Sequence, residues 1–593
     1  MTTFFRRRFS LTPVRLLLMA GWWGLLAAPN FAPAAGFRVW TITETRRVLR
    51  SDPPETNASA SLQAARNEWG DFQILFRSEE PVQRVGLEPG PLRGPDGFAL
   101  SEAHLRLYRE HQLYLTNGTY RNDSFQPDWY PDPLIPFRDP MTGRPLQGPR
   151  FQAVPFDLPA GQTHGFWVDV HVPTNAPPGD YRGVFRLTAG GRRAADVPVA
   201  LKVWNFTLPE TPTLVTAFGS PRLREYYSRR TKEASEPEPA DWDAIERQCA
   251  QLLSEHHLNA EPPARALTPV AVAGGSFAIP SGQVRALREF VDRYHINALR
   301  TPHPDSVVRD PDQQRETLRA WLRAFDEAAR ELDRPGLVFY TYLKDEPNTL
   351  EDYRYVQKWG RAVRECRSVV KVLVVEQPWT ELGFQGADSA WGDLYGAVDI
   401  WCPLFSLHRQ ASAAARQTLG ETIWTYTALC QGQPTPWWHI DFPLLNYRVP
   451  AWMAWRDGMK GLLYWGGMSY WRQSADPWTQ APFYSERGEA SQPGRKPVIF
   501  NGEGSLVYPA HPVGYDGVAP TIRLKALRDS IQDFEYLAIL QRLGRSAEAE
   551  KAVRALTPTF FQWNKAPRAY QDARALLAEQ IVTSQKNAAP PSR

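Results

Sequence analysis

Cysteine is scarce in this sequence. The 593 residues include only four cysteines, Cys249, Cys366, Cys402 and Cys430, which lie far apart and form no Cys-x-x-Cys motif. Structural zinc sites typically use closely spaced cysteine pairs. The spacing therefore argues against a cysteine metal cluster, and it does not decide whether these residues form one or two disulfides.

An excess of charge of one sign is also missing. The chain has 68 Lys and Arg residues against 64 Asp and Glu residues, which gives a net charge of +4. Residues 1–35 contain four arginines and no acid, so a chain without them is neutral. A neutral chain lacks the basic surface that nucleic acids and anionic membranes attract. We therefore expect neither of these partners.

The apolar segment near the N-terminus is too short and too interrupted for a convincing membrane span. Residues 16–28 are mostly apolar, follow several arginines and precede small residues at positions 32–35. This order is typical of a secretory signal peptide, and a membrane-spanning helix needs a longer apolar run. We expect cleavage near Ala34 or Ala35 and export to the periplasm or the outside. No cysteine lies there to carry a lipid anchor.

Several common catalytic motifs are missing. The sequence has no Gly-x-Ser-x-Gly elbow, and neither a phosphate-binding P-loop nor a Gly-x-Gly-x-x-Gly fingerprint follows a predicted strand. This excludes the usual serine hydrolase and dinucleotide-binding classes, and we expect no cofactor. His439 and Asp441 are two metal-ligand types close together, but two ligands without a third do not predict a metal site.

Aromatic residues, by contrast, are abundant. The chain has 22 Trp, 22 Tyr and 28 Phe, and many of the Trp and Tyr residues fall near the ends of predicted strands. Aromatic rings stack on the apolar faces of sugars, while the polar tips of Tyr and Trp form hydrogen bonds at wet surfaces. The composition favours a carbohydrate partner; the alternative is a large core that is rich in Trp.

Residues 37–210 have the pattern of a β-sandwich domain. Apolar residues alternate with others in several runs, for example at Phe72, Ile74 and Phe76, and turns with Pro and Gly separate the runs. Residues 128–136 contain so many prolines that they predict an ordered loop. A proline-rich linker follows at 208–212.

Residues 214–520 alternate between strand and helix patterns. Eight strands over about 250 residues are typical of a (β/α)8 barrel of the TIM type. The predicted strands are 214–219, 258–262, 297–302, 336–344, 369–376, 398–405, 422–429 and 461–469. Residues 472–520 predict a long polar loop at the end of this barrel domain. Residues 521–585 predict a helical segment, and residues 586–593 a disordered tail.

Two adjacent acids, Asp345 and Glu346, stand at the end of the fourth predicted strand. Pro347 follows them, and Thr349-Leu-Glu-Asp352 is a capping box that predicts a helix start. The acids therefore occupy a strand-to-helix turn, where α/β barrels carry their catalytic residues. Because successive strand residues point to opposite faces, both can face one pocket only if the strand twists or bulges there. The alternative is that they only stabilise a helix N-terminus.

Other polar and aromatic residues follow the remaining predicted strands and would share the barrel mouth. The candidates for substrate binding are Arg300, Tyr342, Glu376, Asp399, Trp401, Tyr426, Trp465 and Trp471, with Trp379 close to Glu376. The segment Trp437-Trp-His-Ile-Asp441 could overhang this mouth. Glu376 and Asp399 have an alternative, structural role, in which they bind loop N–H groups or arginines.

These residues belong to sequence blocks that resemble glycoside hydrolase family 123 and its wider relatives, known as domain-of-unknown-function family 4091. The blocks are Ala65-Arg-Asn-Glu-Trp69, Tyr342-Leu-Lys-Asp-Glu-Pro347, Val398-Asp-Ile-Trp-Cys-Pro403, Trp437–Trp455, Gly461-Leu-Leu-Tyr-Trp-Gly466 and Ile522–Tyr536. They occur in order and cover most of the chain that follows the signal peptide.

The resemblance implies a retaining exo-β-N-acetylgalactosaminidase that works by substrate assistance. In this mechanism the 2-acetamido oxygen of the substrate attacks the anomeric carbon, so no second carboxylate is needed as a nucleophile. By position, Glu346 matches the general acid and Asp345 matches the carboxylate that orients the acetamido group. A like-charged neighbour should raise the proton affinity of one of the two acids.

Two alternatives remain open at this stage. One is a non-catalytic carbohydrate-binding protein on the same scaffold, because a fold does not fix a function. The other is a glycosidase of different specificity that uses Glu376 or Asp399 as its nucleophile. The sequence also leaves open the sugar epimer, the linkage, endo or exo action, the natural glycan and the oligomeric state.

Overall fold

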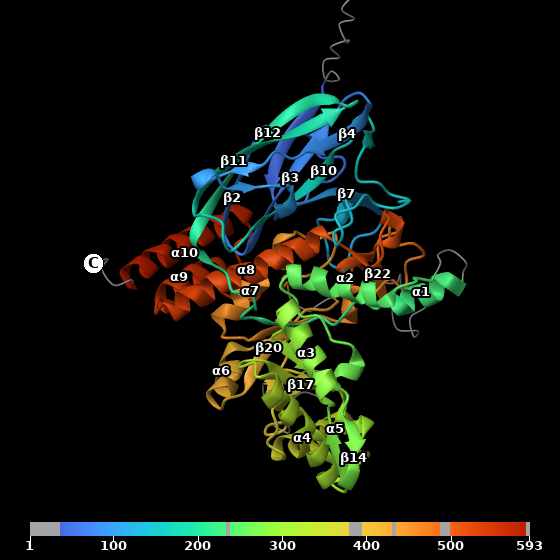
Figure 1. The fold of residues 1–593 in the computed structure, drawn as a ribbon, viewed down its shortest axis with the longest axis vertical. Helices are drawn as coiled ribbons and strands as arrows, with labels where there is room; N and C mark the ends of the chain where they lie inside the picture. The colour runs from blue at the N-terminus through green and yellow to red at the C-terminus, as the bar shows by residue number, and fades with distance from the viewer. Residues whose placement is uncertain (1–35, 233–237, 379–393, 430–433, 487–497, 589–593) are drawn as a thin grey trace, which may run out of the picture.

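The computed structural model describes residues 36–232, 238–378, 394–429, 434–486 and 498–588. The predicted signal peptide, Trp379 and Cys430 lie outside these ranges. The described residues form three tiers, with β-sheets at one end, a layer of helices in the middle and a parallel sheet with its helices at the other end (Figure 1). Within the described ranges, the helices fall short of the length and apolarity that crossing a bilayer requires. Cys249, Cys366 and Cys402 are free thiols.

The N-terminal region consists of two sheets. The first has the order β1 (Arg38–Thr43), β3 (Glu68–Arg77), β10 (His164–Val172), β7 (Leu105–Leu115) and β8 (Asp128–Pro136). The second has the order β2 (Ala60–Arg66), β12 (Arg192–Thr207), β11 (Gly179–Ala189), β4 (Val82–Glu88) and β9 (Phe156–Leu158), with β5 (Leu92–Arg93) and β6 (Ala99–Leu100) beside it.

One apolar cluster lies between the two sheets. Phe72, Ile74 and Phe76 of β3 supply it from the first sheet, and Phe185 of β11 supplies it from the second. The ring centroids of Phe72 and Phe185 are 6.0 Å apart. Alternate residues along each strand thus pack inward, as the period of two in the sequence predicts.

The proline-rich segment 128–136 is a strand, so the prediction of a loop there was wrong. Asp128–Pro136 is β8, which pairs antiparallel with β7 at the edge of the first sheet. Proline cannot donate a backbone hydrogen bond, and an edge strand has one side where no donor is needed. The register also shifts between Glu110 and Gln112 of β7, which accommodates the irregular partner.

The parallel sheet is barrel-like and nearly closed. Its order is β13 (Val215–Ala217), β21 (Gly461–Leu463), β20 (Thr422–Tyr426), β19 (Ile400–Trp401), β18 (Val370–Val375), β17 (Val338–Asp345) and β16 (Ala298–Arg300). The two end strands, β13 and β16, approach each other. The helices between the strands are α1 (Leu223–Lys232), α2 (Trp242–Glu255), α3 (Ser281–Tyr294), α4 (Arg315–Leu332), α5 (Leu350–Glu365), α6 (Gln410–Thr418) and α7 (Leu445–Arg456). A hairpin of β14 (Val270–Val272) and β15 (Ser276–Ala278) packs on α4.

Seven of the eight predicted strands are present, and the strand predicted at 258–262 is not. Asn259 stands there in an irregular segment. Its backbone N–H donates to Thr216 Oγ1 at 2.8 Å, and its side-chain amide donates to Thr216 O at 2.9 Å and Asn297 Oδ1 at 2.8 Å. The Asn259 side-chain amide thus joins β13 to Asn297, the residue before β16, where a strand would have formed backbone hydrogen bonds. Pro262 and Pro263 end the segment.

The prediction of a polar loop at 472–520 was also wrong. The segment contains two hairpins, β22 (Phe483–Glu486) with β23 (Val498–Asn501) and β24 (Val507–Pro509) with β25 (Val518–Pro520). Residues 501–509 are buried. Trp478 and Tyr508 join an apolar cluster with Leu113 and Tyr130 of the N-terminal region, and this packing outweighs the polar composition of the segment.

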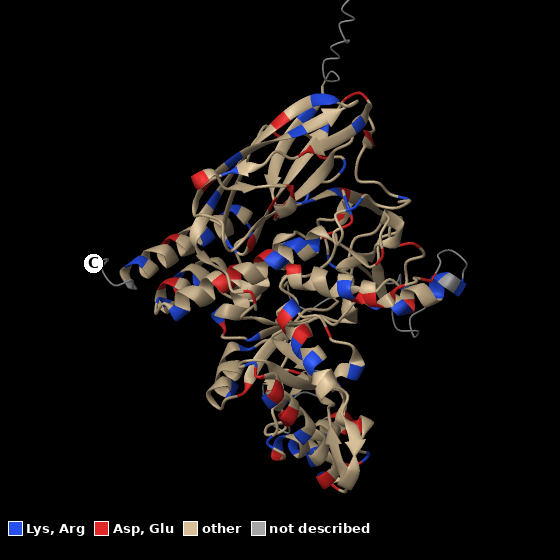
Figure 2. Ribbon diagram, viewed as in Figure 1, with Lys and Arg blue, Asp and Glu red and all other residues tan. Residues whose placement is uncertain are grey.

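Three C-terminal helices form the middle tier: α8 (Ile522–Arg542), α9 (Ser546–Leu556) and α10 (Pro567–Ala588). Helix α8 is buried from Ile522 to Leu540 and brings basic residues under the first N-terminal sheet (Figure 2). Arg528 donates to Asp71 at 2.9 Å and to Asp169 at 3.0 Å, and Lys525 donates to Asp169 at 2.7 Å. Helix α10 extends to Ala588, three residues into the predicted tail; the rest of that tail lies outside the described ranges.

Candidate active site

Strand β17 bulges just before the two adjacent acids. In its pairing with β18, Tyr342 stands opposite Leu373 and Lys344 opposite Val374, so Leu343 is an extra residue. Without this bulge, Lys344 would share the inner face with Tyr342, and Asp345 would point outward. Lys344 instead points to the helix layer, where its Nζ lies 2.6 Å from Asp352 of α5. The bulge that the sequence required is confirmed.

A tyrosine of the inner face binds each acid. Tyr342 donates its hydroxyl hydrogen to Asp345 Oδ1 at 2.8 Å, and Tyr426 at the end of β20 donates to Glu346 Oε1. Glu346 has a φ of +41°, a left-handed conformation that is rare outside glycine and that turns its side chain away from the strand direction. Both tyrosines pack in or against the apolar cluster inside the barrel-like sheet. Both carboxylates therefore face the same end of the sheet.

Burial and the nearby carboxylates keep these two tyrosines protonated. Burial raises the pKa of the Tyr426 hydroxyl well above its usual value, and the negative charge and hydrogen bond of Glu346 add to the rise. Burial, followed by the charge of Asp345, likewise raises the pKa of Tyr342. Each tyrosine is therefore a fixed donor to its carboxylate.

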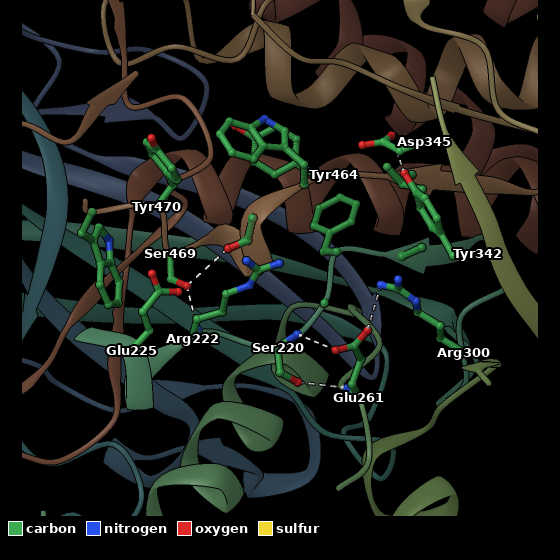
Figure 3. A pocket seen from close by; sticks show the side chains of 18 of the residues that line it. Ser220, Arg222, Glu225, Glu261, Arg300, Tyr342, Asp345, Tyr464, Ser469 and Tyr470 are labelled. Carbon is green, nitrogen blue, oxygen red and sulfur yellow. Dashed lines mark hydrogen bonds and ion pairs between the residues drawn. The ribbon is translucent and has the colours of Figure 1, made fainter. Parts of the chain in front are cut away.

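A pocket of about 490 Å³ opens beside Asp345. Figure 3 shows Asp345 and Tyr342 on one side of it and Ser469, Tyr470 and Glu225 on the opposite side. The predicted site residues that line it are Arg300, Tyr342, Asp345, Trp465 and Trp471. Such a mixture of carboxylates, arginines and aromatic rings suits a sugar, whose hydroxyls accept and donate and whose faces are apolar.

Arg300 lies at the end of β16 and lines the pocket. Its guanidinium carbon lies 4.8 Å from the centroid of the Tyr342 ring, and its Nη1 lies 4.0 Å from Glu261. The Arg300 side chain is 49% exposed, so it is available to a ligand. Arg300 contacts the Tyr342 ring, and the Tyr342 hydroxyl binds Asp345, so Tyr342 connects the two charged residues.

Asp399 and Trp401 do not line this pocket. Asp399 precedes β19 and binds the Val372 N–H at 2.9 Å and Arg364 Nε of α5 at 3.0 Å. Trp401 is buried among residues of the helix layer and donates its Nε1 hydrogen to Glu421 at 2.6 Å. Their side chains point outward from the sheet because they alternate with Ile400 and Cys402, which point inward. Asp399 thus binds a backbone N–H group and an arginine, as expected if its role is structural.

Glu376 also has structural contacts. It is 6% exposed, and it accepts hydrogen bonds from the Gln377 N–H at 2.9 Å and the Tyr353 hydroxyl at 3.3 Å. The overhanging segment 437–441 is largely buried as well. Asp441 accepts from Thr119 and Asn122 of the N-terminal region, and His439 is fully buried. Over the described ranges, no group of three His, Cys, Asp or Glu residues could hold a metal ion.

Several residues of the pocket were not predicted. They are Arg222, Glu225, Arg229, Glu261, Tyr464 and Arg472. Glu261 had a detectable signal, since it ends the predicted second strand. Glu225 and Arg229 lie in α1, and the others come from irregular connections after β13 and β21, where hydrophobic periodicity carries no information about direction.

Comparisons with known proteins bear on the family and on the fold. Residues 305–540 match the family model described as "Glycoside hydrolase 123, catalytic domain". No curated protein matches the sequence. Among solved structures, a family 123 glycoside hydrolase from Clostridium perfringens, studied for glycolipid glycan hydrolysis, has a TM-score of 0.60 and 14% identity. The alignment covers 93% of this chain and 98% of that one.

Two further solved structures are much less similar. A family 39 glycoside hydrolase from Bacteroides cellulosilyticus has a TM-score of 0.30 at 10% identity, with 80% of this chain and 82% of that one covered. A family 5 xyloglucanase from Bacteroides ovatus has a TM-score of 0.24 at 9% identity, with 74% and 96% covered. Both TM-scores are too low to show a shared overall fold. The family model matches residues 305–540, which include both adjacent acids, and over this part the chain is similar to the catalytic domain of glycoside hydrolase family 123.

Proposed function

We propose that this glycosidase is a retaining exo-β-N-acetylgalactosaminidase that uses the 2-acetamido group of its substrate as the nucleophile. The observation that carries the proposal is the pair Asp345 and Glu346, adjacent in the chain and bound to separate tyrosines at one end of the sheet. Exo action fits a pocket of about 490 Å³, a volume suited to a terminal sugar.

The two acids would have different roles. Glu346 would protonate the leaving oxygen, and Asp345 would orient the acetamido group and stabilise the charge that develops on it. Adjacent residues are poorly placed to lie on opposite faces of the scissile bond at the ~5–5.5 Å separation of a two-carboxylate retaining pair. A nucleophile already attached to the substrate avoids this constraint and gains the high effective concentration of an intramolecular reaction.

The contacts of the other acids support the same choice. The two nucleophile candidates from the sequence, Glu376 and Asp399, do not line the pocket, and both already bind backbone N–H groups and a tyrosine or an arginine. A non-catalytic sugar-binding protein would have no need of a bulge that turns the Asp345 carboxylate inward beside Glu346.

Two further proposals concern the fold of the protein and its location. We propose that the parallel sheet is a (β/α)8 barrel whose second strand has degenerated to the segment around Asn259, and that the N-terminal region is a β-sandwich domain. Export before action is proposed from the signal-like residues 1–35.

The test is a screen of chromogenic glycosides. We expect turnover of 4-nitrophenyl N-acetyl-β-galactosaminide and none of the matching β-galactoside or β-glucoside, with inhibition by a thiazoline that mimics the bicyclic intermediate. Turnover of the plain sugars, or a covalent adduct of a 2-fluoro sugar on Glu376 or Asp399, would overturn the proposal.

A further inference from the structure

A buried carboxyl group lies directly behind the aromatic wall of the pocket. Glu503 is 1% exposed, and Trp465 donates its Nε1 hydrogen to Glu503 Oε1. The Tyr464 hydroxyl lies 3.4 Å from the same oxygen, and His439 Nδ1 lies 3.4 Å from Oε2. Both Trp465 and Tyr464 line the pocket, whereas Glu503 does not.

The six-membered ring of the Trp465 indole also packs against the backbone of Gly504. A Cβ atom on Gly504 would lie 3.0 Å from Cζ2 and Cη2 of the indole, so the ring rests on the Gly504 backbone. Gly504 has a φ of +69°, which other residues rarely adopt. The centroid of the Tyr470 ring lies 5.1 Å from that of the Trp465 ring, and both residues line the pocket.

The segment that carries Glu503 is itself fixed at several points. Arg523 of α8 donates to Gly502 O at 3.1 Å, and Asn501 Nδ2 donates to Asn117 O of the N-terminal region at 2.9 Å. The Gly504 N–H donates to the Tyr464 hydroxyl at 2.8 Å. Glu503 therefore stands on a rigid support and cannot follow the indole if the ring moves.

We propose that Glu503 is a positioning residue that acts through Trp465, holding the indole as a fixed wall of the sugar pocket. A buried carboxyl group is unfavourable unless hydrogen bonds compensate, and both of its side-chain donors, Trp465 and Tyr464, belong to the pocket wall. The inference rests on the proposed function only in requiring that the pocket binds a sugar.

Kinetics with a double-mutant cycle form the first test, using the glycoside that the wild type hydrolyses. Glu503→Leu removes the acceptor, and we expect KM to rise by roughly tenfold, as for one lost hydrogen bond to a charged group. Glu503→Gln keeps an acceptor oxygen and should restore most of the loss. In a Trp465→Phe background, Glu503→Leu should have little further effect on KM, because the two residues act as one unit.

Glu421 offers a matched control. It accepts the Nε1 hydrogen of Trp401 in the same way, but outside the pocket. Glu421→Leu should therefore alter thermal stability without altering KM. Equal effects of Glu421→Leu and Glu503→Leu on KM, or additive effects of Glu503→Leu and Trp465→Phe, would overturn the inference.

A spectroscopic test needs no substrate and so separates this inference from the proposed function. In protein labelled with 5-fluorotryptophan, the Trp465 resonance is identified by its loss in Trp465→Phe. We expect Glu503→Leu to shift and broaden this resonance, because the ring gains freedom. An unchanged resonance overturns the positioning role even if the enzyme proves active. A shifted resonance in a protein that fails the glycoside screen supports the positioning role and contradicts only the proposed function.

Discussion

Tyr426 and Glu346 connect two strands that are not neighbours. The hydrogen bond runs from the end of β20 to the residue after β17, and β19 and β18 lie between these strands in the sheet. A contact of this kind is available only when the sheet curves enough to bring the two strand ends across one mouth. The position of the proposed acid therefore depends on the curvature of the whole sheet as well as on its own turn.

Tyr426→Phe tests this contact. Removing the hydroxyl leaves the ring and its packing but deprives Glu346 of a donor. We expect kcat/KM to fall by roughly tenfold to a hundredfold, as for the loss of a hydrogen bond to a charged group. Thermal unfolding should change little. Steady-state kinetics on an N-acetyl-β-glycoside would measure the effect, and wild-type rates would show that the tyrosine does not support catalysis.

Glu346→Gln tests the proposed general acid. The variant cannot donate a proton, so we expect natural glycosides to be hydrolysed roughly 10²–10⁴-fold more slowly. Aryl glycosides with good leaving groups need less protonation and should retain much more activity. Comparing 4-nitrophenyl and alkyl glycosides of one sugar gives the contrast, and an equal loss on both would assign Glu346 another role.

Arg528→Met tests the buried ion pairs between α8 and the N-terminal sheet. Arg528 binds Asp71 and Asp169, and all three side chains are 1% exposed. Removing the arginine leaves buried acids without their counter-charge, and we expect a loss of about 3–5 kcal/mol in unfolding free energy. Arg568→Met is the control. Its ion pair with Asp572 is largely exposed, and its removal should cost less than about 1 kcal/mol in chemical denaturation.

Glu110→Gln tests a buried carboxyl group away from the pocket. Glu110 lies in β7, is 1% exposed, and its Oε1 has no hydrogen-bond partner within the described residues. Burial raises its pKa to about 8. The folded state thus retains a proton that the unfolded state loses near its usual, lower pKa, so the contribution of Glu110 to stability falls as pH rises towards 8.

The glutamine variant has no such proton to lose. Calorimetry between pH 5 and pH 8 should show that its melting temperature, relative to the wild type, rises with pH. A difference that stays constant across this range would mean that Glu110 titrates alike in both states.

The sequence predicted the strand and helix order of the barrel-like region because its buried strands and amphipathic helices have distinct periods. The failures share one cause. At Asn259, in β8 and in residues 472–520, tertiary contacts determine the conformation: a side-chain amide, an edge position and the packing of Trp478 against another region. Local composition contains none of these contacts.

The same limit applies to the candidate site. The position of Asp345 and Glu346 at a strand end was visible, and so was the need for a bulge, because both follow from alternation along one strand. Asp399 and Trp401 show the converse. They lie within the predicted strand 398–405, but the direction of each side chain depends on where the short observed strand begins, and the sequence does not mark that residue.

The contacts of Asn117, Thr119 and Asn122 with Asp441 and Asn501 have a practical consequence for anyone who divides this chain. A fragment cut at the linker near 208–212 would keep both catalytic candidates. It would lose the hydrogen bonds from the N-terminal region that fix the segment carrying Glu503. The N-terminal region is then no detachable accessory module, because part of the scaffolding of the pocket is encoded some three hundred residues upstream of the wall it supports.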